Sequence, residues 1–297
     1  MTNRPKTIGA LIEYGAAELE RGGVFFGHGT DNAIDEAASL VYCVAGLDHQ
    51  AAGPPPYGEA VDPAVCERVL ELLATRIAER RPMPYLLQEA WFAGLRFYVD
   101  ERVLIPRSPF AELIGWRFEP WLEPSRVERI LEIGTGSGCI AIVCARAFPA
   151  ARVVATDLSQ DALAVARINV DRHGLSDRVE LLEADLFDGV DGRFDLIVSN
   201  PPYVPDAEAA CLPPEYAHEP AMALGSGPDG LESTRHILQD APRHLAPDGL
   251  LAIEVGCGWP ALERAFPQLP FVWPDFESGG EGIALIGAAD LNRTDAI

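Results

Sequence analysis

Lysine is almost absent from this sequence, because Lys6 is the only one in 297 residues. Lysine and arginine together number 23 against 45 acidic residues, which leaves a formal net charge of -22. Residues 1–108 carry 15 acidic and 10 basic side chains, whereas residues 109–297 carry 30 and 13. Binding along DNA or RNA needs clustered basic side chains, so we expect no DNA partner. A basic protein would instead be attracted, although the charge also fits simple solubility.

Long apolar runs and metal-binding cysteine patterns are missing as well. No run approaches the roughly 18 apolar residues of a membrane helix, and the first residues lack the apolar core of a signal peptide. None of the six cysteines forms a CxxC pair or has a histidine at ligand spacing. We therefore expect a cytoplasmic protein with no membrane contact, no metal site and no disulfide framework.

The N-terminal third is predicted to be helical. Apolar residues recur there at helical spacing, which indicates amphipathic helices at residues 7–22, 31–47 and 63–80. Asp31 and Asp62 are suitable N-caps for the second and third of these.

A change of composition follows at residues 91–106. This stretch is aromatic and β-branched, with a polar break at residues 100–102, and it predicts a β-hairpin. We therefore divide the chain into a helical domain at residues 1–88, a β-hairpin linker at 89–108 and a larger domain at 109–297. The helical domain is the part that we expect to recognise the substrate.

Strands and helices alternate from residue 128 onward. The predicted strands are Arg129–Ile133, Arg152–Thr156, Val179–Glu183, Phe194–Ser199, Leu250–Val255 and Ile283–Ile286. Helical stretches lie between most of them, at Ser137–Phe148, Gln160–His173 and Leu231–Ala241. This alternation predicts an α/β fold with a mostly parallel sheet, in which a ligand binds beyond the carboxyl ends of the strands.

A glycine-rich turn ends the first of these strands. It reads Gly134-Thr135-Gly136-Ser137-Gly138, and the glycines allow tight turning and close approach of the backbone to a ligand. A dinucleotide fingerprint has the spacing GxGxxG, but Cys139 stands where its third glycine belongs. This disfavours a nicotinamide dehydrogenase and suits a ligand without phosphates, such as S-adenosylmethionine.

Acidic residues end the next two strands. Asp157 is placed to accept both ribose hydroxyl protons, and the alternative is the N-cap of the following helix. Asp185 is a candidate acceptor from an adenine amino group, with Leu186 and Phe187 as an apolar wall and a source of a backbone N–H. An ordinary turn with core packing is the alternative for these three.

The fourth strand runs into Asn200-Pro201-Pro202-Tyr203, the most specific feature of the chain. Methyl transfer to an amide or aromatic amine requires that the flat NH₂ group be held so that the methyl arrives out of plane. The Asn200 side-chain oxygen and the Pro201 carbonyl can accept hydrogen bonds from its two N–H groups. The prolines stiffen the loop, and Tyr203 offers a face for stacking. A proline-rich turn is the alternative.

These motifs together resemble the class I S-adenosylmethionine methyltransferases that modify planar nitrogens. The stretch Trp91–Ile114 resembles the hairpin and PR…E segment of the protein-glutamine N5-methyltransferases, which also have a small helical N-terminal domain. The resemblance implies a Rossmann-like fold with a mostly parallel seven-stranded sheet. It places Gly134–Gly138, Asp157, Leu186 and Asn200 at the cofactor, and Asn200–Tyr203 at the glutamine.

Two bacterial branches of that family differ in their substrate, a release-factor GGQ glutamine or a glutamine of large-subunit ribosomal protein L3. Residues 106–112 depart from the PRPDTE that is typical of the release-factor branch, and Ala90-Trp91-Phe92 favours the ribosomal-protein branch. The resemblance therefore implies a basic ribosomal protein as partner, before ribosome assembly. It also implies that Arg107 and Glu112 brace the cleft, with structural salt bridges as the alternative.

Two further alternatives stay open. An adenine-N6 methyltransferase would use the same loop on a flipped base, but the net charge and the single lysine disfavour it. A non-enzymatic ribosome-assembly factor would keep the fold without the chemistry, and the intact glycine turn and Asn200–Tyr203 disfavour that.

Overall fold

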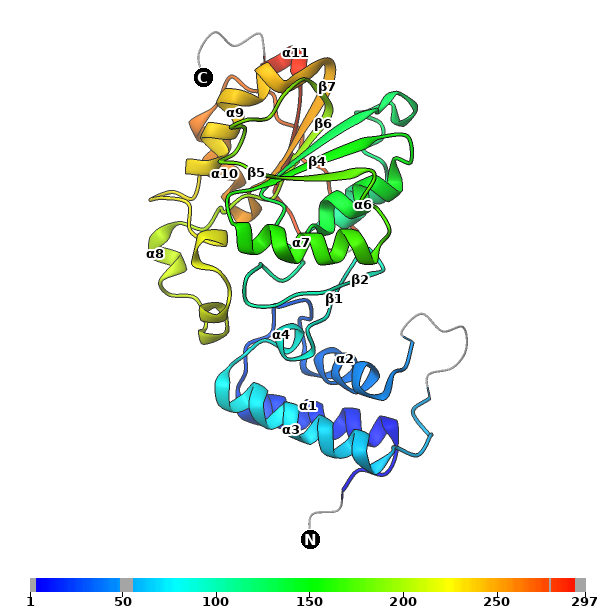
Figure 1. The fold of residues 1–297 in the computed structure, drawn as a ribbon. Helices are drawn as coiled ribbons and strands as arrows, with labels where there is room; N and C mark the ends of the chain where they lie inside the picture. The colour runs from blue at the N-terminus through cyan, green and yellow to red at the C-terminus, as the bar shows by residue number, and fades with distance from the viewer. Residues whose placement is uncertain (1–3, 49–55, 278, 292–297) are drawn as a thin grey trace. The chain divides into compact units, whose positions relative to one another are not determined.

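The computed structural model describes residues 4–48, 56–277 and 279–291, which form two compact units (Figure 1). The first unit runs to Ala90 and also includes Pro213–His218. The second unit consists of Trp91–Leu212 and the chain from Glu219 onward. The chain thus leaves the second unit after Leu212 and returns to it at Glu219. Among the described residues, no helix is long and apolar enough to cross a membrane.

Helices make up most of the first unit, namely α1 (Ile8–Gly22), α2 (Ala33–Ala45), α3 (Pro63–Glu79) and α4 (Met83–Leu87). Their apolar stripes meet in one core that includes Leu11, Leu40 and Val69, all fully buried. The three expected helices are confirmed. The fourth is a short turn of helix that periodicity could not indicate, because it spans too few residues to show a repeat.

Side-chain caps set the start of each long helix. Thr7 accepts a hydrogen bond from the backbone of Ala10 at 3.2 Å, and Asp62, as expected, accepts one from Ala64 at 2.7 Å. The expected cap Asp31 is wrong, because Asn32 accepts from the backbone of Asp35 at 2.9 Å. Asn32 has the extended backbone that an N-cap requires, so the helix begins one residue later.

The hairpin is shorter than expected. It consists of β1 (Ala90–Phe92) and β2 (Leu95–Phe97), joined at Ala93-Gly94, where both residues have positive φ. The expected strands through residue 106, with a turn at 100–102, are wrong. Asp100 instead accepts hydrogen bonds from the Tyr98 hydroxyl and the Arg102 guanidinium, which form a separate turn after the hairpin.

One six-stranded sheet forms the centre of the second unit. Its strand order is β5 (Val179–Glu183), β4 (Arg152–Asp157), β3 (Arg129–Ile133), β6 (Phe194–Ser199), β7 (Leu245–Glu254) and β8 (Ile283–Gly287). All neighbours are parallel except β7 and β8, which are antiparallel. The mostly parallel α/β fold is confirmed. The order reverses direction between β3 and β6, which places a ligand-binding crevice at the carboxyl ends of those strands.

The expected count of seven strands is wrong for the described residues. Where a seventh strand would add to β8, only Val272 pairs with it, through two reciprocal backbone hydrogen bonds of 2.9 Å with Leu285. Pro270 and Pro274 flank this position. Proline has no backbone N–H to donate, so the ladder stops at a single bridge.

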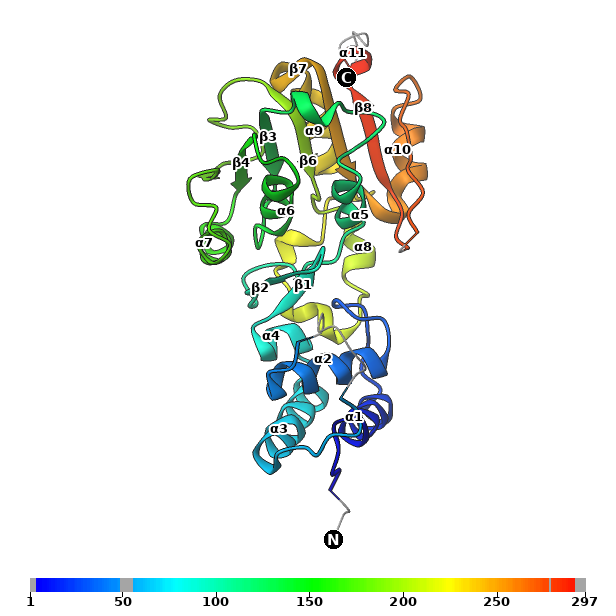
Figure 2. The same cartoon turned by 90° about the vertical axis from the view of Figure 1, so that its right-hand side faces the viewer.

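Helices cover both faces of the sheet (Figures 1 and 2). On one face lie α5 (Phe110–Gly115), α6 (Cys139–Ala147) and α7 (Gln160–Arg172), and on the other lie α9 (Glu232–His244), α10 (Trp259–Ala265) and α11 (Ala288–Leu291). Alternate residues along β3 separate accordingly: Ile130 packs in the first core, and Leu131 packs in the second. A short helix, α8 (Asp206–Ala209), lies in the loop after β6.

Candidate active site

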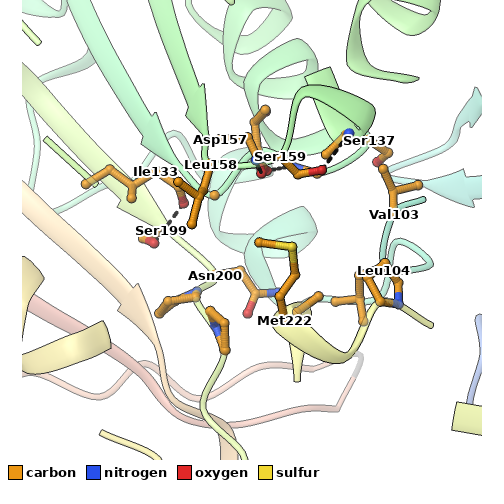
Figure 3. Close-up of a pocket in the computed structure, with 18 of the residues that line it drawn as sticks. Val103, Leu104, Ile133, Ser137, Asp157, Leu158, Ser159, Ser199, Asn200 and Met222 are labelled. Atoms are coloured by element: carbon orange, nitrogen blue, oxygen red, sulfur yellow. Dashed lines mark hydrogen bonds between the residues drawn. The ribbon is translucent and has the colours of Figure 1, made fainter. Parts of the chain in front are cut away.

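A cavity of about 380 Å³ lies at the carboxyl ends of β3, β4 and β6 (Figure 3). Residues from the glycine turn, from both acidic strand ends and from the loop after β6 line it together. Of the predicted site residues, the cavity brings together Gly134, Thr135, Gly136, Ser137, Asp157, Asp185, Leu186, Asn200, Pro201 and Pro202. Gly138 and Tyr203 are not part of its lining.

Backbone hydrogen bonds hold the glycine turn on the end of β4. The N–H groups of Gly134 and Thr135 both donate to the Thr156 carbonyl, at 2.9 and 2.8 Å. Gly134 and Gly136 have φ of 73° and 53°, which favours glycine. A Cβ added at either position would meet no atom within 4 Å, so the backbone there faces open space. The turn therefore forms a cradle that leaves room for a ligand.

The third glycine of the turn has a packing role. Gly138 has φ of 81° and caps α6, and an added Cβ would lie 3.3 Å from the Cβ of Ala166. Gly138 is thus required where α6 passes close to α7, rather than at the cavity wall.

Asp157 joins the turn to the end of β4. One carboxylate oxygen accepts from the Gly136 N–H at 2.8 Å, and the other accepts from the Ser159 N–H at 2.9 Å. Burial raises the pKa of Asp157, while these two N–H groups oppose that change. The alternative role as N-cap is wrong, because Ser159 caps α7 by accepting from Ala162. Asp157 keeps acceptor capacity for a ligand, since each carboxylate oxygen can accept more than one hydrogen bond.

The loop after β5 contributes one exposed acid and one strained residue. Asp185 is exposed and Leu186 is half-buried with φ of 52°, a conformation that non-glycine residues adopt at a cost. The Leu186 carbonyl lies 3.4 Å from the Thr156 hydroxyl, which donates to it. Phe187 does not form the expected wall, because it is buried in the core and stacks on His244 at 4.7 Å.

The loop after β6 presents Asn200 to the cavity. Ser199 ends β6 and donates its hydroxyl to the Ile133 carbonyl at 2.8 Å, so the end of β6 is fixed to β3 (Figure 3). Asn200 is half-buried, Pro201 is buried, and both line the cavity with Pro202. Asn200 and the glycine turn follow the adjacent strands β6 and β3, and both line the same cavity.

Tyr203 faces an adjoining groove, which shares Arg107 and Ser108 with the cavity. Its hydroxyl donates to Glu254 at 3.1 Å, and Ser108 donates to the other oxygen of the same carboxylate at 2.5 Å. The Tyr203 ring packs so closely on Gly256 that a Cβ there would lie 2.9 Å from it. These contacts fix the Tyr203 ring at the end of the Asn200–Tyr203 loop.

Sequence reasoning missed two buried carboxyls at this edge of the sheet. Glu132 is 1% exposed and accepts from the Thr135 hydroxyl at 2.5 Å and the Ala141 N–H at 3.0 Å. Burial raises the pKa of Glu132 to about 8 and that of Glu254 to about 7. The available signal was an acid in an otherwise apolar strand just before the ligand-binding edge. Because Glu132 already occupies an N–H at the start of α6, this helix end is poorly suited to a phosphate.

Arg107 and Glu112 have separate partners. Arg107 forms two parallel hydrogen bonds of 2.6 Å with Glu219, which is 5% exposed and also accepts from the Ile105 N–H. Glu112 accepts from the Glu277 N–H at 2.8 Å. Arg107 thus forms the structural salt bridge that was the alternative, and it also lines the cavity. Glu112 lines the adjoining groove, and bracing of the cleft stays a prediction for both residues.

The chain is similar to known methyltransferases. Residues 120–212 match the model of the "Methyltransferase small domain" family. Proteins named "Ribosomal protein uL3 glutamine methyltransferase" are 45% identical from Neisseria meningitidis serogroup B, covering 94% of this chain and 92% of theirs, and 46% identical from Bordetella pertussis, covering 97% of both. The corresponding Xanthomonas campestris pv. campestris protein is 47% identical over 96% of this chain and 92% of its own.

A solved structure shares the fold at much lower identity. The hMettl16 catalytic domain, in complex with MAT2A 3′UTR hairpin 1, superposes with a TM-score of 0.54 at 16% identity, covering 83% of this chain and 90% of that one. This likeness concerns the fold alone.

The sheet, the glycine cradle and the Asn-Pro-Pro loop define a class I methyltransferase that depends on S-adenosylmethionine. With relatives at this identity over nearly its full length, the chain belongs to the family of ribosomal protein uL3 glutamine methyltransferases.

Proposed function

We propose that the protein transfers a methyl group from S-adenosylmethionine to the side-chain amide nitrogen, N5, of a glutamine in ribosomal protein uL3. The observation that carries the proposal is that Asn200-Pro201-Pro202 and the glycine turn line one cavity. The names of the relatives supply the acceptor protein.

The cofactor side of the site is assigned from the cavity wall. The open cradle at residues 134–137 receives the methionine end, and Asp157 accepts hydrogen bonds from the ribose hydroxyls. Asp185 and Leu186 border the adenine, and Asn200 stands between cofactor and acceptor. When bound, S-adenosylmethionine supplies an electrophilic methyl on a sulfonium sulfur.

The acceptor side acts through geometry. The amide nitrogen of glutamine is a weak nucleophile because its lone pair is delocalised into the amide plane. The Asn200 side-chain oxygen and the Pro201 carbonyl accept hydrogen bonds from its two N–H groups, so the amide plane is held facing the methyl group. The same oxygens stabilise positive charge that develops on nitrogen. The nitrogen loses one of its two protons to solvent, and S-adenosylhomocysteine is the other product. Tyr203, held by Glu254, keeps the loop in this geometry.

Transfer of radiolabelled methyl groups tests the reaction. Wild type, Asn200→Ala and Asn200→Asp are incubated with free uL3, a release factor and unmethylated DNA. We expect label on one glutamine of uL3, a loss in Asn200→Ala on the order of 10²-fold or more, and a smaller loss in Asn200→Asp, which keeps an acceptor oxygen. Glu180→Gln, at an exposed position on β5, is the control variant and should methylate uL3 as wild type does.

Each other outcome has a distinct meaning. Label on the release factor alone would replace the acceptor and keep the mechanism, and label on DNA alone would indicate an adenine. Full uL3 methylation by Asn200→Ala would contradict the assigned role of the loop. Absence of label on every acceptor, with uL3 still bound, would support an assembly factor.

The timing and place of the reaction are part of the proposal. A net charge of -22 attracts a free basic ribosomal protein, and assembly onto RNA would neutralise much of that partner's charge. We expect the enzyme to act in the cytoplasm on uL3 before assembly, with the helical unit recognising the substrate. Equal methylation rates for free uL3 and assembled large subunits would contradict this timing.

A further inference from the structure

Pro213–His218 is far in sequence from the helices with which it forms a unit. It begins ten residues after Tyr203 and contains the 3-10 helix η2 (Pro214–His218). A loop that follows the catalytic motif therefore supplies a piece of the helical unit. The residues that hold this piece have no part in the methyl-transfer site described above.

A buried ion pair anchors the segment. Glu215 is 1% exposed, and one of its oxygens accepts from the Phe25 N–H at 2.8 Å and from Arg76 at 3.2 Å. Arg76 of α3 is fully buried and also donates to Glu36 at 2.8 Å and to the Phe25 carbonyl at 2.8 Å. All three nitrogens of this guanidinium thus donate hydrogen bonds within the first unit.

The electrostatics show that Glu215 is held as a carboxylate. Burial alone would raise its pKa, but the Phe25 N–H and Arg76 hold the pKa of Glu215 below its ordinary value. Burial raises the pKa of Glu36, the other partner of Arg76, in spite of that arginine. Arg80 lies 3.5 Å from the same Glu215 oxygen, and Arg76 would keep Glu36 if Glu215 were removed. Loss of Glu215 would therefore remove the bonds that hold the segment without leaving Arg76 unpaired.

Aromatic contacts add to the anchor. The Tyr216 ring lies 4.6 Å from the His28 ring and 5.8 Å from the Phe25 ring. His218 lies within hydrogen-bond distance, 3.0 Å, of the Glu79 carbonyl at the end of α3. The segment is therefore held to the helices by the buried Glu215 and by the half-buried Tyr216 and His218.

The same loop forms a wall of the methyl-transfer cavity. Its two ends are joined where Val204 donates to the Leu224 carbonyl at 2.9 Å and Ser226 donates to the Val204 carbonyl at 3.0 Å. Pro220 and Met222 lie on the returning arm and line the same cavity as Asn200 (Figure 3). This arm begins at Glu219, which Arg107 holds in the second unit.

We propose that Arg76 and Glu215 are positioning residues for the loop of residues 204–226, because they hold its middle while its returning arm carries Pro220 and Met222 in the cavity lining. Two carboxylates four residues apart hold the loop, Glu215 in one unit and Glu219 in the other. This inference rests on the proposed function.

The test compares Glu215→Ala with the matched control Glu71→Ala, at an exposed ion pair on the same helix as Arg76. Steady-state kinetics with free uL3 and calorimetry with S-adenosylmethionine are measured for both. We expect Glu215→Ala to raise KM for uL3 or lower kcat, with kcat/KM reduced on the order of tenfold or more, and cofactor affinity within about twofold of wild type. Glu71→Ala should match wild type.

A spin label on Cys211, an exposed thiol within the loop, reports the loop directly. In a Cys43→Ser/Cys257→Ser background we expect a restricted spectrum that becomes mobile with Glu215→Ala. If Glu215→Ala does not fold, Glu215→Gln and Arg76→Met are measured in the same way, with a smaller effect expected from Glu215→Gln because it keeps an acceptor for Phe25.

Unchanged label mobility, unchanged kcat/KM, or an equal loss of cofactor affinity would each overturn the inference. Failure of wild type to methylate uL3 would instead refute the proposed function. In that case, label mobility and cofactor affinity still decide whether Glu215 positions the loop.

Discussion

Three carboxyl groups stand at or beside the ends of buried strands, and each has a different task. Glu132 ties the glycine turn to the start of α6, Asp157 ties that turn to β4, and Glu254 fixes the end of the Asn200–Tyr203 loop. Asp157 differs from the other two, because each of its oxygens accepts a hydrogen bond from a backbone N–H group. Asp157 also lines the cavity. It is therefore the acid best placed to accept from a ligand.

We predict that Asp157→Ala weakens binding of S-adenosylmethionine by about tenfold or more, because it removes hydrogen bonds to a charged group and releases Gly136. Isothermal titration calorimetry measures this directly. Asp161→Ala, an exposed position in the first turn of α7, is the control and should bind normally. Normal cofactor affinity in Asp157→Ala would contradict the assigned role.

The buried carboxyl of Glu254 predicts a pH-dependent stability. Burial raises its pKa from 4.5 to about 7, so the fold favours the protonated form. The stabilisation is fully present below pH 4.5 and is lost as the pH rises through about 7. Relative to Glu254→Gln, which does not titrate, the free energy of unfolding of wild type should fall by about 3 kcal/mol across this range. Chemical denaturation at several pH values tests this, and a constant difference would contradict it.

At the scale of elements, local caps and periodicity account for the helices. Helices α1 and α3 begin at side chains that cap their own first turn, and α1 and α2 end at glycines in the left-handed conformation. The hairpin and the last strand position were harder to predict. The hairpin turn depends on Ala93, which adopts a positive φ that its residue type does not suggest. The missing strand depends on prolines whose effect is visible only once β8 is paired.

Gly282, just before β8, is a position where we expect substitution to destabilise the protein. Gly282 has φ of 79°, and an added Cβ would lie 2.0 Å from the Gly256 carbonyl oxygen. We expect Gly282→Ala to lower the free energy of unfolding by roughly 2–5 kcal/mol, from strained backbone and overpacking. It should also impair methylation, because Gly256 supports Tyr203.

Gly287→Ala is the matched control for that change. It lies at the other end of β8, where an added Cβ meets nothing within 4 Å. Denaturant titration of both variants measures the difference. A Gly282→Ala protein as stable as Gly287→Ala would show that the strands can separate at little cost.

At the scale of the whole molecule, the charge of the protein should control the encounter with its substrate. A net charge of -22 steers a basic protein over long distances, and salt screens this attraction. We predict that kcat/KM for uL3 falls roughly tenfold between about 50 and 300 mM salt, while kcat and cofactor affinity change little. Stopped-flow or initial-rate measurements at several salt concentrations test it, and a salt-independent kcat/KM would contradict it.

The sequence by itself determined the parts whose causes are local. Helical periodicity set α1, α2 and α3, alternation of strands and helices predicted the parallel sheet, and the glycine spacing with Asn200–Tyr203 indicated the class of chemistry. Those signals lie within a few residues of one another, so they can be read without knowledge of the fold.

Only the tertiary structure decided which distant residues share a carboxylate or a cavity. Glu254 meets Ser108 and Tyr203, Arg107 meets Glu219, and Arg76 meets Glu215, across separations of 51 to 146 residues. Nothing local marks such partners, because a buried charge finds its partner only when the chain has folded around both. The course of the loop after Tyr203 was therefore decided by packing, and with it the wall of the acceptor site.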